Sequence, residues 1–182
     1  MAAYHWQSVI DFWFTEISPK HWWQKDDAFD QLIKQRFGDW LIAAKKGELY
    51  QWRSEPLGRL AEVIVLDQFS RNIHRDTPAA FEADPMALAL AQEAVALGAD
   101  KALPAQMAPF LYMPYMHSES AVIHQVAMTL FDSDAARGNL EFEIRHKAII
   151  DRFGRYPHRN AILGRVSSDE EEAFLQQPGS SF

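Results

Sequence analysis

An arginine- and histidine-rich motif occurs twice in this chain, and no other pattern in it is better suited to chemistry. Residues Phe69–Arg75 and Phe153–Arg159 both read Phe-x-Arg-x-x-His-Arg. Arginine presents a planar fork of donors that matches carboxylate and phosphate oxygens, and it stays charged at neutral pH. Histidine adds a donor whose charge can change near neutrality. The two segments therefore predict recognition of an anion.

The second copy lies in a basic stretch of an acidic protein. The segment from Arg145 to Arg165 holds six cations and one acid, a formal charge of +5, whereas the whole chain carries −7. Arginines near helix ends also cap carbonyls or pair with acids, and Asp67 lies four residues before Arg71, within helical pairing distance. A purely structural polar network is therefore the alternative to anion binding.

The two copies are not predicted to be a repeated fold unit, because so short a match also arises by chance. The first copy finishes a helical pattern, whereas Gly154 and Pro157 make the second copy a loop. We interpret the copies as two separate sources of similar chemistry.

Asp67 and Gln68 are polar residues in the otherwise apolar helical segment Leu60–Ile73. A buried carboxylate needs partners or a shifted pKa. Arg71, or an arginine of the second motif, could supply that partner. We therefore expect the two motifs to meet beside Asp67 and Gln68 and to line one polar cleft.

A second group of candidate residues is Met116–Glu119, with His124 further along the chain. If one helix held them, His117, Glu119 and His124 would lie close together and could bind zinc or iron. No zinc motif is present, however, and Ser118 and Glu119 also suit the start of a helix. We therefore expect no metal and no cofactor.

Several other functions lack the sequence patterns that they need. Adjacent residues such as His117, Ser118 and Glu119 point in different directions and cannot form a triad with one another. The chain has no nucleophile elbow, P-loop or glycine-rich dinucleotide motif. The pair Trp22-Trp23 and the stripe Trp6/Trp13 favour packing over a ligand cage, because buried aromatic residues are the commoner use.

Composition indicates a globular protein of one domain, residues 1–182. Apolar residues make up 48% and aromatic residues 13% of the chain. The chain contains no cysteine, which excludes disulfides and thiol chemistry and fits a reducing compartment. There is no signal-peptide pattern or apolar run long enough for a membrane span, and the negative charge argues against nucleic-acid binding. We expect a cytoplasmic protein; its oligomeric state is not indicated.

Helical periodicity dominates, and no segment alternates as a strand does. The predicted helices are Tyr4–Phe14, Lys25–Lys46, Pro56–Ile73 (central and buried), Pro85–Leu97, Pro104–Met113, Glu119–Phe131, Leu140–Arg152 and one that begins at Ser167. Asp84 is predicted to be an N-cap before Pro85, and Ser167 with Glu170 to form a capping box. Seven or eight helices with short connections predict an all-α fold of stacked antiparallel helical hairpins, with a frayed tail over 176–182.

Three segments carry a resemblance to a known family. Leu66–Asn72, Met116–Glu119 and Arg152–Asn160 resemble the bacterial domain-of-unknown-function family 924, and Val9–Phe14 and Trp22–Asp30 resemble its N-terminal part. The resemblance covers about residues 8–175. It implies a tetratricopeptide-like superhelix of helical hairpins and no established activity. Ser70 departs from the family, which often has proline there.

Three functions follow as hypotheses. The first is a binding protein whose cleft holds an anionic small molecule or peptide through a carboxylate or phosphate. The second is an enzyme in which Asp67, His117, Glu119 or His158 performs acid–base chemistry on such an anion. The third is an interaction scaffold with a structural core of arginines and acids. The predicted binding residues are Asp67, Gln68, Arg71, Asn72, Arg75, His117, Glu119, Arg155, His158, Arg159 and Asn160.

Overall fold

The computed structural model describes residues 4–182, so the first three residues of the predicted domain lie outside the description. The described residues form helices joined by short turns and contain no β-strand, which confirms the all-α prediction. The α-helices are α1 (Trp6–Asp11), α2 (Asp27–Lys45), α3 (Pro56–Ile64), α4 (Ser70–Ile73), α5 (Asp84–Ala96), α6 (Ala108–Met116), α7 (Ala121–Phe131), α8 (Leu140–Phe153), α9 (Asn160–Leu163) and α10 (Asp169–Leu175).

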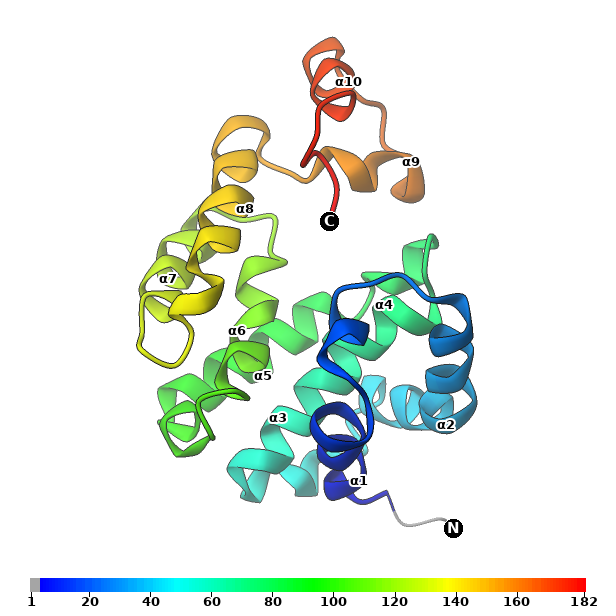
Figure 1. Cartoon of the computed structure of the whole chain (residues 1–182), viewed down its shortest axis with the longest axis vertical. Coiled ribbons are helices and arrows are strands. Elements are labelled where there is room, and N and C mark those ends of the chain that lie inside the picture. Colours follow the sequence, from blue (N-terminus) through cyan, green and yellow to red (C-terminus); the bar gives the residue numbers. More distant parts are fainter. Residues whose placement is uncertain (1–3) are drawn as a thin grey trace.

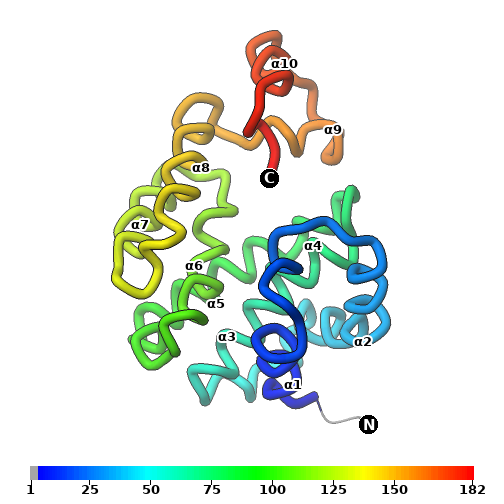
Figure 2. Tube along the Cα trace, in the orientation of Figure 1, coloured from blue at the N-terminus to red at the C-terminus, as the bar shows by residue number. Residues whose placement is uncertain are grey.

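The helices are stacked along a curved path (Figure 1). The N-terminal helices α1 to α4 lie at one end, α5 to α8 follow along one side, and α9 and α10 lie at the other end. The Cα trace in Figure 2 shows that the C-terminal segment turns back toward the middle of the molecule. No helix in the described part of the chain is both long enough and apolar enough to cross a bilayer.

A continuous helical segment passes through the centre of the fold. It consists of α3, a π-helical turn over Val65–Phe69 and α4. Leu60, Leu66 and Phe69 have no exposed surface, and α1, α2, α5 and α6 all contact this segment. The prediction of a central buried helix is therefore confirmed. Its apolar residues occur on most faces because neighbouring helices enclose it.

The π-helical turn contains Asp67 and Gln68, the polar residues of this segment that sequence analysis singled out. A π turn adds a residue to the helical repeat, and such turns are frequent at functional sites. Both side chains are buried here, with Asp67 only 1% exposed. The local irregularity therefore places two polar side chains inside a core that is otherwise apolar.

The tryptophans divide between the core and the surface. Trp13 is 1% exposed and packs against Phe69 and Phe110, as the predicted helical stripe requires. Trp22 donates its indole N–H to the carbonyl oxygen of Trp13. Trp23 differs from the expectation of simple packing, because 60% of its surface is exposed.

Two predicted helix boundaries are wrong around His117. The helix expected at Pro104–Met113 is α6, which begins at Ala108 and continues through Pro114 to Met116. Its Pro109 occupies the first turn, where the missing N–H has no intrahelical partner to lose. The next helix begins at Ala121, so His117 lies in the connection between helices and does not share a helical face with His124.

Two predicted caps are also shifted. Asp84 is the first residue of α5 and makes no cap hydrogen bond, because its carboxylate binds Arg71. The capping box is formed by Ser168 and Glu171, one residue later than predicted. The sequence has a serine pair followed by consecutive acids, so both registers are chemically possible, and the contacts of Glu171 select the second.

The second copy of the motif follows the end of a helix, as predicted. Gly154 adopts a φ of 69° at the end of α8, a left-handed conformation that glycine adopts without steric cost. Pro157–Arg159 then form a single 3₁₀ turn. These two features direct the chain away from α8.

The C-terminal tail, 176–182, is exposed at every residue except Ser180 and makes contacts with the rest of the fold. The Ser180 hydroxyl is buried and donates to the carbonyl oxygen of Leu175 at 3.1 Å. The Phe182 ring lies against His146, with 3.8 Å between the ring centroids. The frayed tail over 176–182 stays a prediction.

Gly58 and Gly38 allow a direct test of how closely α3 packs. A Cβ at Gly58 would lie 2.0 Å from the carbonyl oxygen of Trp52, whereas a Cβ at Gly38 in α2 would meet nothing within 4 Å. We expect Gly58→Ala to lower the free energy of unfolding by about 3 kcal/mol or more, since overpacking is costly. Gly38→Ala should raise it by about 0.5–1 kcal/mol, because alanine favours helix. Chemical denaturation measures both, and changes of equal sign would contradict this packing.

Candidate functional site

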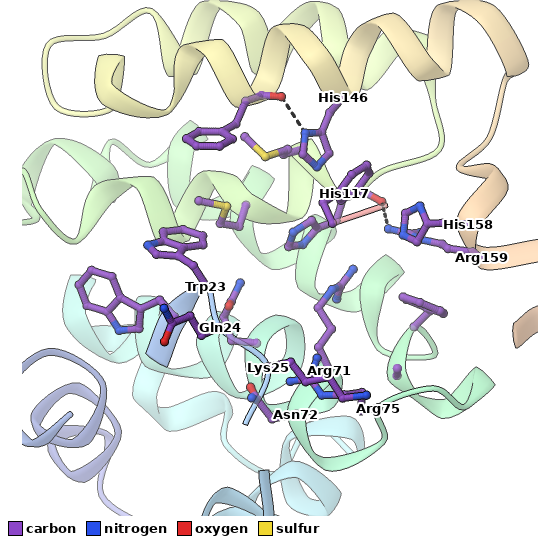
Figure 3. Close-up of a pocket in the computed structure, with 18 of the residues that line it drawn as sticks. Trp23, Gln24, Lys25, Arg71, Asn72, Arg75, His117, His146, His158 and Arg159 are labelled. Atoms are coloured by element: carbon purple, nitrogen blue, oxygen red, sulfur yellow. Dashed lines mark hydrogen bonds between the residues drawn. The ribbon is translucent and has the colours of Figure 1, made fainter. Parts of the chain in front are cut away.

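A cleft of about 770 Å³ lies between segments that are far apart in the sequence. Figure 3 shows its labelled residues, which come from the region before α2, from α4, from the end of α6, from α8 and from the turn before α9. A second hollow of about 470 Å³ shares the lining residues Phe81, His117 and Arg159 with the first. These three side chains therefore form the partition between the two spaces.

Asp67 is the buried acid at the base of this partition. It accepts hydrogen bonds from Gln68 Nε2 at 2.7 Å and His117 Nδ1 at 2.7 Å, and Arg71 Nη1 lies 3.3 Å away. Burial alone would raise its pKa, but His117 and Arg71 outweigh that effect and lower the pKa to about 2. Asp67 is therefore ionised in the folded protein at neutral pH.

Arg71 and Arg159, one from each motif, meet beside Asp84. Arg71 binds Asp84 with both terminal nitrogens, at 2.7 and 2.9 Å. Arg159 Nη1 lies 3.8 Å from the same carboxylate, and its Nη2 donates to the carbonyl oxygen of His117 at 2.9 Å. The two segments thus come together in the region that sequence analysis proposed, next to Asp67.

Arg159 is the least compensated of the buried cations in the cleft. It is 5% exposed, its ion pair with Asp84 is long, and its Nε has no hydrogen-bond partner among residues 4–182. Its guanidinium lies over the rings of Phe81 and Tyr156, 4.5 and 4.7 Å from their centroids. Burial and the nearby charge of Arg71 lower the pKa of Arg159. The ring contacts fix its orientation while donor capacity remains unused.

His117 lies directly after α6, with its two ring nitrogens in different environments. Nδ1 bonds Asp67, whereas Nε2 makes no hydrogen bond within the described chain. Burial and the positive charge of Arg71 lower the pKa of His117, although Asp67 acts in the opposite direction. The ring is therefore neutral at pH 7, with its proton on the nitrogen that faces the carboxylate.

Two further histidines line the cleft in their neutral form. Burial lowers the pKa of His146 to about 3, and its Nδ1 donates to the carbonyl oxygen of Phe142 at 2.7 Å. Burial and the charge of Arg159 lower the pKa of His158 to about 4, and its buried Nδ1 has no partner in the described residues.

The charged residues that line the cleft are mostly cations: Lys25, Arg71, Arg75 and Arg159, with Asp76 as the acid among them. Lys25 pairs with Asp76 at 3.3 Å. Arg75 binds Asp30 at 2.5 and 2.9 Å, and Asn72 donates to the same carboxylate at 2.8 Å. Arg75 and Asn72 therefore reach the cleft wall with part of their donor capacity occupied by Asp30.

The remaining lining is largely apolar. It contains aromatic and thioether side chains from several helices and turns, namely Trp22, Trp23, Phe81, Met113, Met116, Phe142 and Phe182. Aromatic faces and methionine adapt to flat or irregular apolar groups. The cleft thus combines a positively charged wall with an apolar one.

Three predicted binding residues make structural contacts outside the larger cleft. Glu119 binds Arg165 at 2.8 and 2.9 Å and accepts the backbone N–H of Tyr156, although it also lines the second hollow. Arg155 binds Glu171 at 2.7 and 2.8 Å, which lowers the pKa of Glu171 to about 2.

Asn160 donates to the hydroxyl of Ser167 at 3.0 Å. Together with the pairs of Glu119 and Arg155, this contact holds the segment after α8 in place. These residues therefore position the chain that carries His158 and Arg159, and they do not face the larger cleft.

His124, the other half of the metal hypothesis, lies in a separate buried cluster. Its Nδ1 is 2.6 Å from Glu143 and its Nε2 is 2.7 Å from the carbonyl oxygen of Ser118. Both ring nitrogens are occupied by protein acceptors, so His124 and His117 do not converge on one site.

Several cleft residues escaped the sequence analysis. Asp84 was interpreted as a helix cap, whereas its carboxylate links the two motif arginines. Trp23 and Phe142 carried no usable signal in the sequence, because their exposed fractions of 60% and 53%, which mark a possible binding surface, are known only from the fold. His146 carried none, because a lone histidine on an amphipathic helix is an ordinary occurrence.

The fold and the site define an all-α protein that encloses a ligand-sized cleft with a basic wall. The chain belongs to the family described as "Bacterial protein of unknown function (DUF924)", which matches residues 9–179. The family resemblance predicted from the motifs is thereby confirmed.

A solved structure, that of the protein of unknown function ATU0120 from Agrobacterium tumefaciens, is similar to this chain. It has 36% sequence identity and a TM-score of 0.88, over 94% of this chain and 96% of that one. No curated protein matches significantly. The comparisons therefore establish the family and the fold and indicate no ligand or reaction.

The buried neutral histidines predict a loss of stability in mild acid. Because folding lowers the pKa of His146 from 6.5 to about 3, the unfolded chain binds more protons below pH 6.5 and is favoured there. Lowering the pH from 7 to 5 should therefore reduce the free energy of unfolding by about 2 kcal/mol through this residue alone. Denaturation at pH 7 and pH 5 should show a smaller difference for His146→Gln than for the wild type. His5→Gln, at an exposed histidine, is the control. If His146→Gln showed the same pH difference in free energy of unfolding as the wild type, His146 would not be the source of the acid sensitivity.

Proposed function

We propose that this protein binds, in the cytoplasm, a small anionic molecule whose carboxylate or phosphate contacts Arg159 and whose apolar part lies on the aromatic wall. The single observation that carries the proposal is the buried guanidinium of Arg159, with a long ion pair and a partnerless Nε. A buried donor without a partner is costly, and an anionic oxygen is the partner that suits it.

The shape and lining of the cleft support a ligand of metabolite size. A volume of about 770 Å³ lies within the range of small-molecule sites, which are usually mostly apolar with a few polar groups. Trp23 and Phe142 provide apolar surface in the same cleft as the cations. The carboxylate of a short peptide would suit the same wall, since the recognised group is the anion.

The ring contacts of Arg159 favour binding over a purely structural role. Stacking on Phe81 and Tyr156 holds the guanidinium without occupying its N–H donors. A guanidinium that is already oriented loses little side-chain entropy when an anion binds.

Isothermal titration calorimetry with phenyl phosphate, benzoate, inorganic phosphate and acetate tests the proposal. We expect the two aromatic anions to bind more tightly than the corresponding small anions, because they also contact the apolar wall. Arg159→Met should weaken binding at least tenfold, given that a hydrogen bond to a charged group contributes about 1.5–3 kcal/mol. Arg145→Met removes an exposed arginine outside the cleft and is the matched control. Absence of binding by the wild type at millimolar concentrations refutes the proposal.

Arg155 tests whether the structural contacts of the second motif can be separated from the ligand site. Because Arg155 pairs with Glu171 and donates to the carbonyl oxygen of Val166, we expect Arg155→Ala to lower the melting temperature. Affinity for phenyl phosphate, measured below the melting transition, should stay within about twofold, since the lost contacts are outside the larger cleft. A large loss of affinity without a loss of stability would place Arg155 in the ligand site.

A further inference from the structure

The pair formed by Asp67 and His117 has a geometry that simple anion binding does not require. Asp67 accepts a hydrogen bond from His117 Nδ1 at 2.7 Å, which fixes the tautomer and the orientation of the imidazole. The other nitrogen, Nε2, has no hydrogen-bond partner in the described chain, and the side chain lines both hollows. A carboxylate that orients a neutral histidine with a free Nε2 is the arrangement of a general base.

We infer that His117 is a general base, positioned by Asp67, which activates water for hydrolysis of a carboxylic ester whose anionic group is held by Arg159. This inference rests on the proposed anion site, because Arg159 selects the substrate. His117 would be the catalytic residue and Asp67 a positioning residue.

The placement of Arg159 supports a shared site. Its Nη2 donates to the carbonyl oxygen of His117 itself, at 2.9 Å, and both side chains belong to the partition between the hollows. An anion on Arg159 would therefore lie in a space that the His117 side chain also lines (Figure 3). Such proximity is the geometric condition that a general base must meet.

Water is the nucleophile that the lining allows. The residues that line the larger cleft include no serine or threonine, and the chain has no cysteine. Ser118 lines the second hollow, but it is adjacent to His117 in the chain, and adjacent side chains point in different directions. The neutral histidines His146 and His158 also line this cleft, but neither donates a hydrogen bond from Nδ1 to a carboxylate. Only His117 among these three rings is held by an acid.

The proton and bond changes balance without a further reagent. Water transfers a proton to His117 Nε2 while its oxygen bonds to the acyl carbon of the ester. The bond from that carbon to the leaving oxygen then breaks, and the leaving oxygen takes the proton from His117. One ester and one water thus yield one carboxylic acid and one alcohol, and the dyad returns to its starting state.

Electrostatics around His117 agree with this role. The charged and titratable groups that act on it come from five elements: Asp67 of the π turn, Arg71 of α4, Asp84 of α5, His146 of α8 and Arg159 of the turn before α9. Burial and Arg71 lower the pKa of His117 and thereby keep the ring neutral at pH 7. The reaction rate should therefore fall with acid below pH 6.5 and be level above it.

Mono-4-nitrophenyl succinate, an anionic ester that releases a coloured phenolate, is the probe for activity. We expect the wild type to hydrolyse it faster than the neutral 4-nitrophenyl acetate. His117→Gln should lower kcat at least 100-fold, the usual contribution of a general base, with KM changed less than threefold. His74→Gln, which changes a histidine outside both hollows, should retain wild-type kcat.

Asp67→Asn tests positioning separately from stability. An amide can donate to Nδ1, which would move the imidazole proton to Nε2 and remove the base. We expect a lower kcat and the loss of the acid limb of the pH profile, with KM retained. A merely structural Asp67 would change the melting temperature and leave the shape of the pH profile intact.

The outcomes separate this inference from the proposed function. A wild type that binds phenyl phosphate but does not hydrolyse the anionic ester overturns the general base and leaves the anion site standing. A wild type that binds no anion overturns both. Nitrogen-15 NMR of the folded protein gives a second readout, and a proton on His117 Nε2 at pH 7 overturns the dyad whatever the substrate.

Discussion

The ionised carboxylate of Asp67, buried at the centre of an apolar helix, is the constraint on which the rest of the site depends. A charge in such a place is tolerated only when hydrogen bonds and opposite charges surround it, and removing one partner of a buried pair costs about 3–5 kcal/mol. Its partners here are Gln68, Arg71 and His117, from the same segment and from the end of α6. The carboxylate therefore joins the central helix to the chain that borders the cleft.

Compensation of Asp67 continues outward through a chain of contacts. Arg71 satisfies Asp67 and also binds Asp84 at the start of α5, and Asp84 then lies near Arg159. The bidentate pair between Arg71 and Asp84 is short, at 2.7 and 2.9 Å, whereas the outermost pair, between Asp84 and Arg159, is 3.8 Å long. The innermost acid has several partners, while the outermost cation has a long ion pair and an unused donor. Arg159, the outermost cation of this network, is one of the residues that line the cleft.

The same arrangement accounts for a second property of the site. Burial that keeps His117, His146 and His158 neutral also makes the folded state sensitive to acid, since each can gain a proton on unfolding. A neutral imidazole beside an ionised carboxylate can accept a proton from a bound molecule, whereas a charged imidazole cannot. Burial of these histidines is thus the common cause of their ability to accept a proton from a bound molecule and of the sensitivity of the fold to acid.

Much of the fold and part of the site could be predicted from the sequence. Helical periodicity predicted the all-α class and the buried central helix, because the spacing of apolar residues directly reflects burial along a helix. The residue types of the doubled motif indicated anion chemistry, and the polar residues Asp67 and Gln68 marked the point where the motifs come together. The tetratricopeptide-like form of the superhelix stays a prediction.

Only the tertiary structure decided which residues share a site. Arg155 and Arg159 lie four positions apart in one motif, yet Arg155 pairs with Glu171 and Arg159 reaches Asp84. Asp84 looked like a helix cap because a local pattern cannot reveal that an arginine thirteen residues earlier takes its carboxylate. Side-chain type is encoded at each position, but ion pairing depends on distances set by packing between segments remote in the chain. The sequence by itself therefore determined which chemistry is present, and the fold determined where that chemistry is combined.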